Sequence, residues 1–169
     1  MTHELKSISK SGIDEAISKA ELYRYLNEPE ETESICHDIL AIDPAHQVAL
    51  RMLGMAVTDQ FDGSSGDRFG EAESVLRRLT HRYEQLYYRG ILHERRAKAL
   101  LRARRAPHTL LPFFEEAMRC FSQAAEIRPK GNDDAILRWN RCVRILQSNP
   151  EFAAEKEQVA IEDHDSPPV

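Results

Sequence analysis

Residues 116–129, which read EAMRCFSQAAEIRP, decide the fold. They place a small residue at Ala117, a large one at Phe121, a second small one at Ala124 and a proline at Pro129. Residues three and four positions apart share one face of a helix. The small residues let an antiparallel helix approach closely, the large residue fills the gap between helix pairs, and the proline ends the helix. The spacing therefore predicts a helix that packs tightly against its neighbours.

Two earlier stretches repeat this spacing, one with its proline and one without it. They are Thr32, Cys36, Ile39 and Pro44, and Ala72, Leu76 and Leu79. A second spacing, W-x2-L-G-x2-Y, is matched more loosely ahead of each stretch and once after the last. These positions are Ala16, Lys19, Ala20 and Tyr23; Leu50, Leu53, Gly54 and Val57; Leu86 or Tyr87 with Gly90 and Ile91; and Ala135, Trp139 and Cys142.

With these two spacings, residues 13–147 resemble the tetratricopeptide-repeat (TPR) family, whose 34-residue motif joins them. The resemblance implies an all-α fold, a TPR-like right-handed superhelix of antiparallel helix pairs with about three repeats and a C-terminal capping helix. We accordingly expect an N-terminal extension over 1–12, the solenoid over 13–147, the capping helix over 148–162 and a disordered tail over 163–169. The motif is specific for a fold and nearly silent on function.

Capping residues and prolines predict where the helices begin and end. The expected ranges are 13–26, 29–42, 46–59, 68–81, 84–105, 112–127 and 133–147, with a weaker helix from 150 to about 159. Residues 62–67 contain two glycines and no helical periodicity, so they predict a loop insertion. Pro107 and Pro112 are expected to bracket a second insertion, with Pro112 opening the sixth long helix.

The composition fits one domain of amphipathic helices. Of the 169 residues, 30% are charged and 7% are aromatic. No basic and apolar leader follows Met1, and no apolar run approaches the length of a membrane span. The three cysteines lack paired spacing, so we expect free, buried thiols in a reducing compartment. These features predict a cytoplasmic protein that does not associate with membranes.

Motifs for catalysis and metal binding are incomplete in this chain. His93 and Glu94 begin the zinc motif H-E-x-x-H, but Ala97 stands in place of the second histidine. The loop after Asp59 breaks the calcium-binding pattern, and no phosphate-binding or nucleophile motif occurs. We therefore expect neither enzyme activity, nor a cofactor, nor a metal site. Glu94 lies on the apolar stripe of its helix, so it either pairs with Lys98 or a neighbouring arginine, or forms the floor of a ligand groove.

The charge distribution is dipolar. Residues 77–105 hold ten basic residues and two acids, whereas residues 14–43 hold nine acids against Lys19 and Arg24. The basic segment is either a solvated face neutralised by neighbouring helices or a docking surface for acidic groups. We expect it to point outward and to meet an acidic partner, such as the acidic N-terminal end of a second copy. This basic face comprises Arg89, Arg95, Arg96, Arg102 and Arg105.

The TPR resemblance also implies a working surface, because the first helix of each pair in that family lines a concave groove that binds a peptide or a helix. Carried onto this chain, the groove would include Tyr25, Arg51, Met55, Tyr87, Tyr88, Ile91, Arg95, Asn140 and Arg144. Packing beneath a capping helix is the alternative for the same residues. Ile17 and Glu21 stand where the family's chaperone-tail clamp has lysine and asparagine, which argues against a co-chaperone of that type.

The function predicted first is a protein-interaction module or scaffold whose groove binds a peptide or helix of another protein. The alternative is an anion- or nucleic-acid-associated module, or charge-driven self-assembly, through the basic residues 77–105. Few aromatic residues are interleaved there and the isoelectric point is near 5.8, so nucleic acid is the less favoured partner. A bacterial secretion-type chaperone is a minor alternative.

Overall fold

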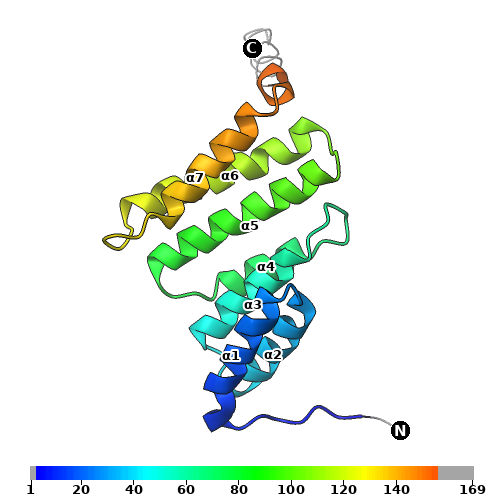
Figure 1. Ribbon diagram of the computed structural model, residues 1–169, viewed down its shortest axis with the longest axis vertical. Helices are drawn as coiled ribbons and strands as arrows, with labels where there is room; N and C mark the ends of the chain where they lie inside the picture. Colours follow the sequence, from blue (N-terminus) through cyan, green and yellow to red (C-terminus); the bar gives the residue numbers. More distant parts are fainter. Residues whose placement is uncertain (1–2, 156–169) are drawn as a thin grey trace, which may run out of the picture.

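The computed structural model describes residues 3–155, and this part of the chain is all-helical (Figure 1). A short 3-10 helix, η1, precedes seven α-helices. Their bounds are η1 Lys10–Gly12, α1 Ile13–Tyr25, α2 Pro29–Ile42, α3 Gln47–Asp59, α4 Phe69–Leu76, α5 Arg82–Arg102, α6 Pro107–Glu126 and α7 Asp134–Gln147.

Each helix packs mainly against the next one in the sequence, and α1 also contacts α3, which in turn contacts α5. Helices α1 to α4 form one half of the molecule, and the long helices α5 and α6 form the other half with α7 (Figure 1). Short connections join most neighbours, so the chain advances as a series of helical hairpins.

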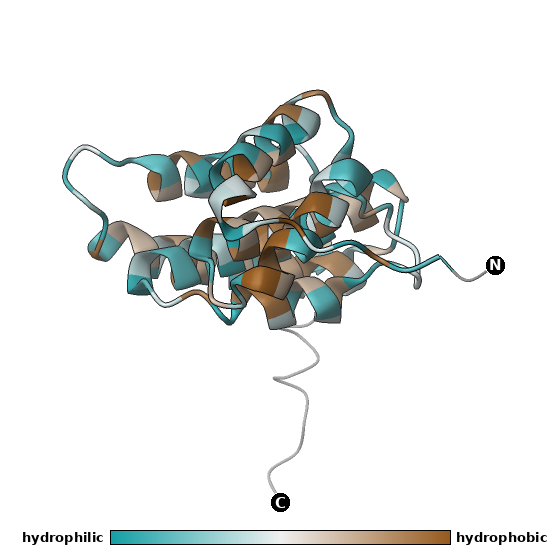
Figure 2. Ribbon diagram, turned by 90° about the horizontal axis from the view of Figure 1, so that it is seen from below, coloured by the Kyte–Doolittle hydropathy of each residue, from teal (hydrophilic) through white to brown (hydrophobic). Residues whose placement is uncertain are grey.

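Two large hydrophobic clusters correspond to the two halves. One includes Cys36, Leu50 and Leu76, and the other includes Phe114 and Phe121. Helix α5 contributes residues to both clusters and so joins the halves. Hydrophobic and hydrophilic residues alternate along the helices, as the brown and teal segments of Figure 2 show. This pattern is that of amphipathic helices buried on one side.

The repeated positions are buried in all three hairpins, as the spacing predicts. This holds for Thr32, Cys36 and Ile39, for Ala72, Leu76 and Leu79, and for Ala117, Phe121 and Ala124. A Cβ atom added to Gly54 would lie 2.4 Å from Leu76 Cδ2, and one added to Gly90 would lie 2.5 Å from Phe121 Cε1. In the first hairpin, Thr32 Oγ1 donates a hydrogen bond of 2.9 Å to the Ala20 carbonyl. Each hairpin therefore closes at a small residue.

The structure corrects the expected start of the sixth long helix. Helix α6 begins at Pro107 rather than Pro112, which lies inside it. Pro112 removes one backbone hydrogen bond near the first turn, a small loss compared with the burial of Leu110 and Leu111 on the second cluster. The second insertion is therefore mostly helical, and only residues 103–106 separate α5 from α6.

Helix α4 also ends earlier than expected, at Leu76 instead of near residue 81. Gln47 of α3 explains the difference, since its Oε1 accepts a hydrogen bond of 2.9 Å from the backbone N–H of Thr80. Leu79 remains buried in the turn that follows the helix. The segment thus keeps its apolar anchor while its backbone leaves the helix.

The first insertion is a loop, as predicted, and side chains hold it in place. Asp67 accepts hydrogen bonds from the backbone N–H groups of Asp62, at 2.9 Å, and Gly63, at 2.8 Å. Gly63 has φ +86°, and a Cβ there would lie 2.6 Å from the carbonyl oxygen of Ala99 on α5. Only glycine fits this close approach without strain.

Residues 151–155 are helical, and Phe152 is buried against the second cluster. The remainder of the expected capping helix over 148–162 and the expected tail over 163–169 lie outside the described residues. The three cysteines are buried free thiols, as predicted. Among the helices of the described part, none combines the length and the apolar character needed to cross a membrane.

Candidate functional site

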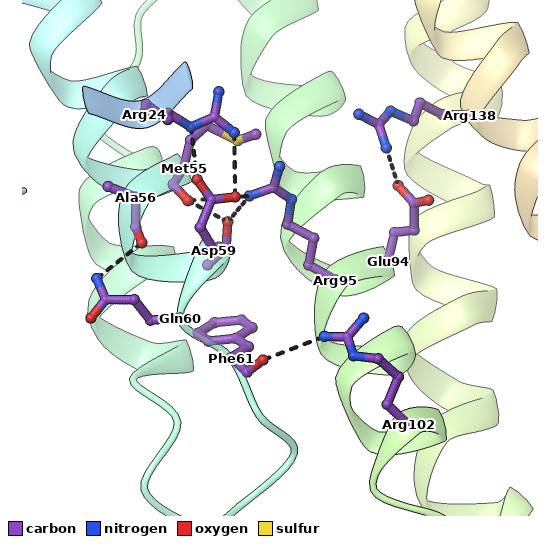
Figure 3. A network of polar contacts seen from close by, with 11 residues as sticks. Arg24, Met55, Ala56, Asp59, Gln60, Phe61, Glu94, Arg95, Arg102 and Arg138 are labelled. Atoms are coloured by element: carbon purple, nitrogen blue, oxygen red, sulfur yellow. Dashed lines mark hydrogen bonds and ion pairs between the residues drawn. The ribbon is translucent and has the colours of Figure 1, made fainter. Parts of the chain in front are cut away.

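A network of charged side chains crosses three helices (Figure 3). Asp59, at the end of α3, accepts a hydrogen bond of 2.8 Å from Arg24 Nε on α1 and forms an ion pair with Arg95 on α5. Arg95 also donates to Thr58 Oγ1, at 2.7 Å, and to the Met55 carbonyl, at 3.2 Å. Burial lowers the pKa of the Arg95 guanidinium, and the nearby Asp59 carboxylate opposes that shift. One carboxylate thus ties together α1, α3 and α5.

Glu94, the residue before Arg95, forms a second group of ion pairs that reaches α7. Its side chain is fully buried, and its Oε2 lies 3.3 Å from Arg138 Nη1 (Figure 3). Its Oε1 lies 3.4 Å from Lys98 Nζ. Both pairings considered for Glu94 from the sequence are therefore present together. A buried carboxylate needs such partners, because desolvation of an isolated charge costs several kcal/mol. That cost approaches the whole free energy of unfolding of a small domain.

We call the surface formed by α1, α3, α5 and α7 the odd-helix face. A hollow of about 170 Å³ on it is lined by Thr58, Asp59, Arg95, Lys98 and Arg102. Arg102 Nη2 reaches the Phe61 carbonyl at 3.4 Å, so this guanidinium closes one side of the hollow (Figure 3). The hollow offers hydrogen-bond donors of three basic side chains around a single carboxylate.

Aromatic residues continue the odd-helix face toward the start of α5. Arg51 on α3 pairs with Glu84 at 2.5 Å, and its guanidinium lies 5.9 Å from the centre of the Tyr88 ring. The Tyr87 ring packs edge-on to the Tyr88 ring, with 5.2 Å between ring centres, and stacks on the Tyr83 ring, with 5.7 Å between ring centres. An arginine beside tyrosines is a combination that protein interfaces favour.

The predicted groove residues do not all reach the surface. Tyr25 and Arg144 are exposed, whereas Arg51, Tyr87, Tyr88, Arg95 and Asn140 are partly exposed. Met55 and Ile91 are only 7% and 2% exposed and belong to the second hydrophobic cluster. The expectation that these two line the groove is therefore wrong. The second cluster joins residues of α3, α5, α6 and α7, and helical spacing alone does not reveal this packing.

The expected outward face of arginines is corrected at two of its five residues, Arg95 and Arg96. Arg95 turns to Asp59, and Arg96 pairs with Asp67 of the loop insertion and donates to the Ser64 carbonyl at 3.2 Å. Arg89, Arg102 and Arg105 are exposed as expected, although Arg89 Nη2 lies 3.0 Å from Glu116 Oε1 of α6 and Arg102 Nη2 donates to the Phe61 carbonyl. The acids that neutralise these residues lie far away in the sequence, so their positions could not be read from the helix that carries the arginines.

Glu33, His37 and Glu71 form the group closest to a metal-ligand set in the described residues, with ligand atoms within 4.8 Å of one another. Arg68 occupies this cluster, donating to the two Glu33 carboxylate oxygens at 2.6 and 2.8 Å. The hydrogen bond from Arg68 lowers the pKa of Glu33 to about 2, although burial opposes it. An ion pair between Glu33 of α2 and Arg68, the residue before α4, therefore accounts for the cluster.

A larger pocket of about 500 Å³ lies among α4, α5 and α6. Four arginines line it: Arg77, Arg82, Arg89 and Arg119. Sequence reasoning missed it because Arg119 stands outside the basic segment and the pocket exists only where three helices meet. We call it the arginine pocket.

No protein-family model matches the chain, and the searches of curated proteins and of solved structures likewise found no significant match. The function of the chain is therefore inferred from its own residues and their geometry.

Proposed function

We propose that the chain is a protein-interaction module in which TPR-like hairpins form a right-handed superhelix and bind a peptide or helix of another protein across the odd-helix face. The observation that carries the proposal is the repeated crossing of Gly54 against Leu76 and of Gly90 against Phe121. Helix pairs that close at equivalent points present equivalent helices side by side, and repeat proteins use such surfaces for binding.

The chemistry of the odd-helix face supports a polar, extended ligand. The hollow at Asp59 and Arg95 presents both charge signs, so it suits backbone amides and carbonyls as well as an acidic side chain. Arg51 and its tyrosine neighbours supply a less polar contact area along the same face. The internal ion pairs of Arg95 and Arg96 leave less free positive charge than nucleic-acid binding requires.

Peptide-array binding tests this function. Arg51→Ala/Arg144→Ala changes two arginines of the odd-helix face while leaving the buried network at Asp59 intact. Arg104→Ala/Arg105→Ala is the matched control, because these two exposed arginines lie in the turn between α5 and α6, outside the four helices of the face. We expect the first variant to lose the peptides that wild type and control retain. Equal binding by all three folded proteins would refute a ligand site on this face.

A further inference from the structure

The arginine pocket exists because neighbouring helices differ in length. Helix α4 ends at Leu76, whereas α5 and α6 run side by side for 21 and 20 residues. The parts of α5 and α6 beyond α4 therefore lack a covering helix on that side. Leu76, Leu86 and Leu92 give the opening an apolar lining.

The charge of the arginine pocket is incompletely neutralised. Arg89 and Arg119 share one carboxylate, because their Nη2 atoms lie 3.0 and 2.6 Å from Glu116 Oε1. Arg77 Nη2 lies 3.1 Å from Glu73 Oε1. Arg82 is exposed and has no ion pair within residues 3–155. Four guanidinium groups thus face two carboxylates around an apolar lining, which suits a ligand that carries both acids and apolar side chains.

The end of α1 has the opposite character. Leu22, Tyr25 and Leu26 are 54%, 89% and 53% exposed. They share one face of the last helical turn, and we call these three residues the α1 knob. Four exposed acids lie within five residues of it in the sequence, and none of them forms an ion pair in the described part of the chain: Glu21, Glu28, Glu30 and Glu31. An exposed apolar group of this kind, rimmed by charge, marks an interaction surface.

We propose that the α1 knob of one copy docks into the arginine pocket of a second copy. The two surfaces are complementary in hydrophobicity and in charge. The apolar side chains of the knob would meet the leucines of the pocket, and the unpaired acids near the knob would meet the unpaired Arg82 and the other pocket arginines. The pocket volume of about 500 Å³ leaves room for an aromatic side chain such as that of Tyr25. The knob includes Tyr25, one of the residues expected in the groove, whereas none of the expected groove residues lines the arginine pocket.

The contact between the α1 knob and the arginine pocket is heterologous, because the two surfaces are different. A dimer formed in this way still presents one free knob, on one copy, and one free pocket, on the other. Assembly then proceeds head to tail and grows with protein concentration. Exposed ion pairs across the contact also make it sensitive to salt.

Sedimentation velocity over a range of concentrations tests the proposal. In about 0.05 M salt we expect wild type to grow beyond a dimer as concentration rises, and about 0.5 M salt to weaken association at least about tenfold. Two variants each remove one side of the contact, Arg77→Ala/Arg82→Glu in the pocket and Leu22→Ser/Tyr25→Ser in the knob. Leu137→Ser/Arg105→Glu is the control, because it changes exposed residues of the same types elsewhere.

Each contact variant alone is expected to stay monomeric, and circular dichroism must show that it keeps its helices. A mixture of the two variants retains one intact knob and one intact pocket, so it is expected to form a heterodimer of one copy of each and nothing larger. The control should assemble like wild type. A wild type that is monomeric at every concentration, or a mixture that stays monomeric, would overturn the proposal. Binding of naphthyl phosphate in the pocket of such a monomeric wild type would assign the pocket to small anions instead.

Discussion

The α3–α4 and α5–α6 hairpins close in the same way but are built differently. In both, a glycine on the first helix meets a large side chain on the second, Gly54 with Leu76 and Gly90 with Phe121. The chain between the paired helices is lengthened in one case as a loop, residues 60–68, and in the other as extra helical turns. The crossing point therefore constrains the packing, and the length between crossings is free to vary. The arginine pocket is one result of that freedom.

Shortening the large residue at each crossing should break the two hairpins to different extents. Phe121→Ala should lower the free energy of unfolding by about 3–5 kcal/mol, because it empties a fully buried site beside Gly90. Leu76→Ala should cost less, about 2–4 kcal/mol, since a smaller side chain is removed. Chemical denaturation measures both values. A smaller loss for Phe121→Ala than for Leu76→Ala would show that the second crossing does not anchor its hairpin.

The comparison also shows what a sequence can and cannot specify. The burial of the small residues Thr32, Ala72 and Ala117 was predictable, because it depends on spacing within single helices. The start of α6 at Pro107 was not, because it depends on where Leu110 and Leu111 find apolar neighbours.

The candidate site was predictable only in part, for the same reason. Helical spacing located Arg51 and Tyr88 on a shared surface, and it identified Glu94 as a residue that needs partners. The ion pairs of Arg95 and Arg96 depend on Asp59 and Asp67, which belong to other elements. Contacts between different elements thus decided which arginines remained free to bind a ligand.

Adding a single methyl group at each glycine should sharpen the comparison. Gly54→Ala and Gly90→Ala should each cost about 1–3 kcal/mol through overpacking, because the new Cβ would overlap Leu76 or Phe121. Gly70→Ala in α4 is the control, since nothing lies within 4 Å of its added Cβ. It should stabilise the protein by up to about 1 kcal/mol through helix propensity. Thermal unfolding distinguishes these signs. Stabilisation by Gly90→Ala would contradict the close approach of α5 and α6.

Acid should weaken both halves of the molecule through equivalent ion pairs. Hydrogen bonds from Arg68 and Arg119 lower the pKa values of Glu33 and Glu116 from 4.5 to about 2, although burial opposes both shifts. These carboxylates bind protons more readily in the unfolded chain. Their stabilisation is therefore complete above pH 4.5 and is lost as the pH falls toward 2.

Each pair should contribute about 1 kcal/mol, because the arginine partners are partly exposed and screened. Denaturant unfolding at a series of pH values should show a shallower acid dependence for Glu33→Gln and for Glu116→Gln than for wild type. Glu126→Gln, at the exposed end of α6, serves as the control and should follow wild type. An unchanged acid dependence in both variants would rule out these pairs as its source.

The smallest expected effect concerns the turns that end α1 and α5, which share one hydrogen-bond pattern. After α1, Asn27 N–H donates to the Arg24 carbonyl at 3.1 Å and Glu28 N–H to the Tyr23 carbonyl at 2.9 Å. After α5, Arg104 N–H donates to Leu101 and Arg105 N–H to Leu100, both at 3.0 Å. This is the Schellman motif, which places the residue after the helix cap in the left-handed region.

Asn27 and Arg104 have φ +61° and +54°, so both turns require a conformation that glycine adopts most easily. Asparagine tolerates it better than arginine does, because its short side chain bonds locally. Arg104→Gly should therefore stabilise the protein by about 0.5 kcal/mol, whereas Asn27→Gly should be close to neutral once the extra freedom of the unfolded chain is included. Paired thermal melts at one pH resolve the difference. If Asn27→Gly proved the more stabilising of the two, backbone strain at residue 104 would not be what distinguishes these turns.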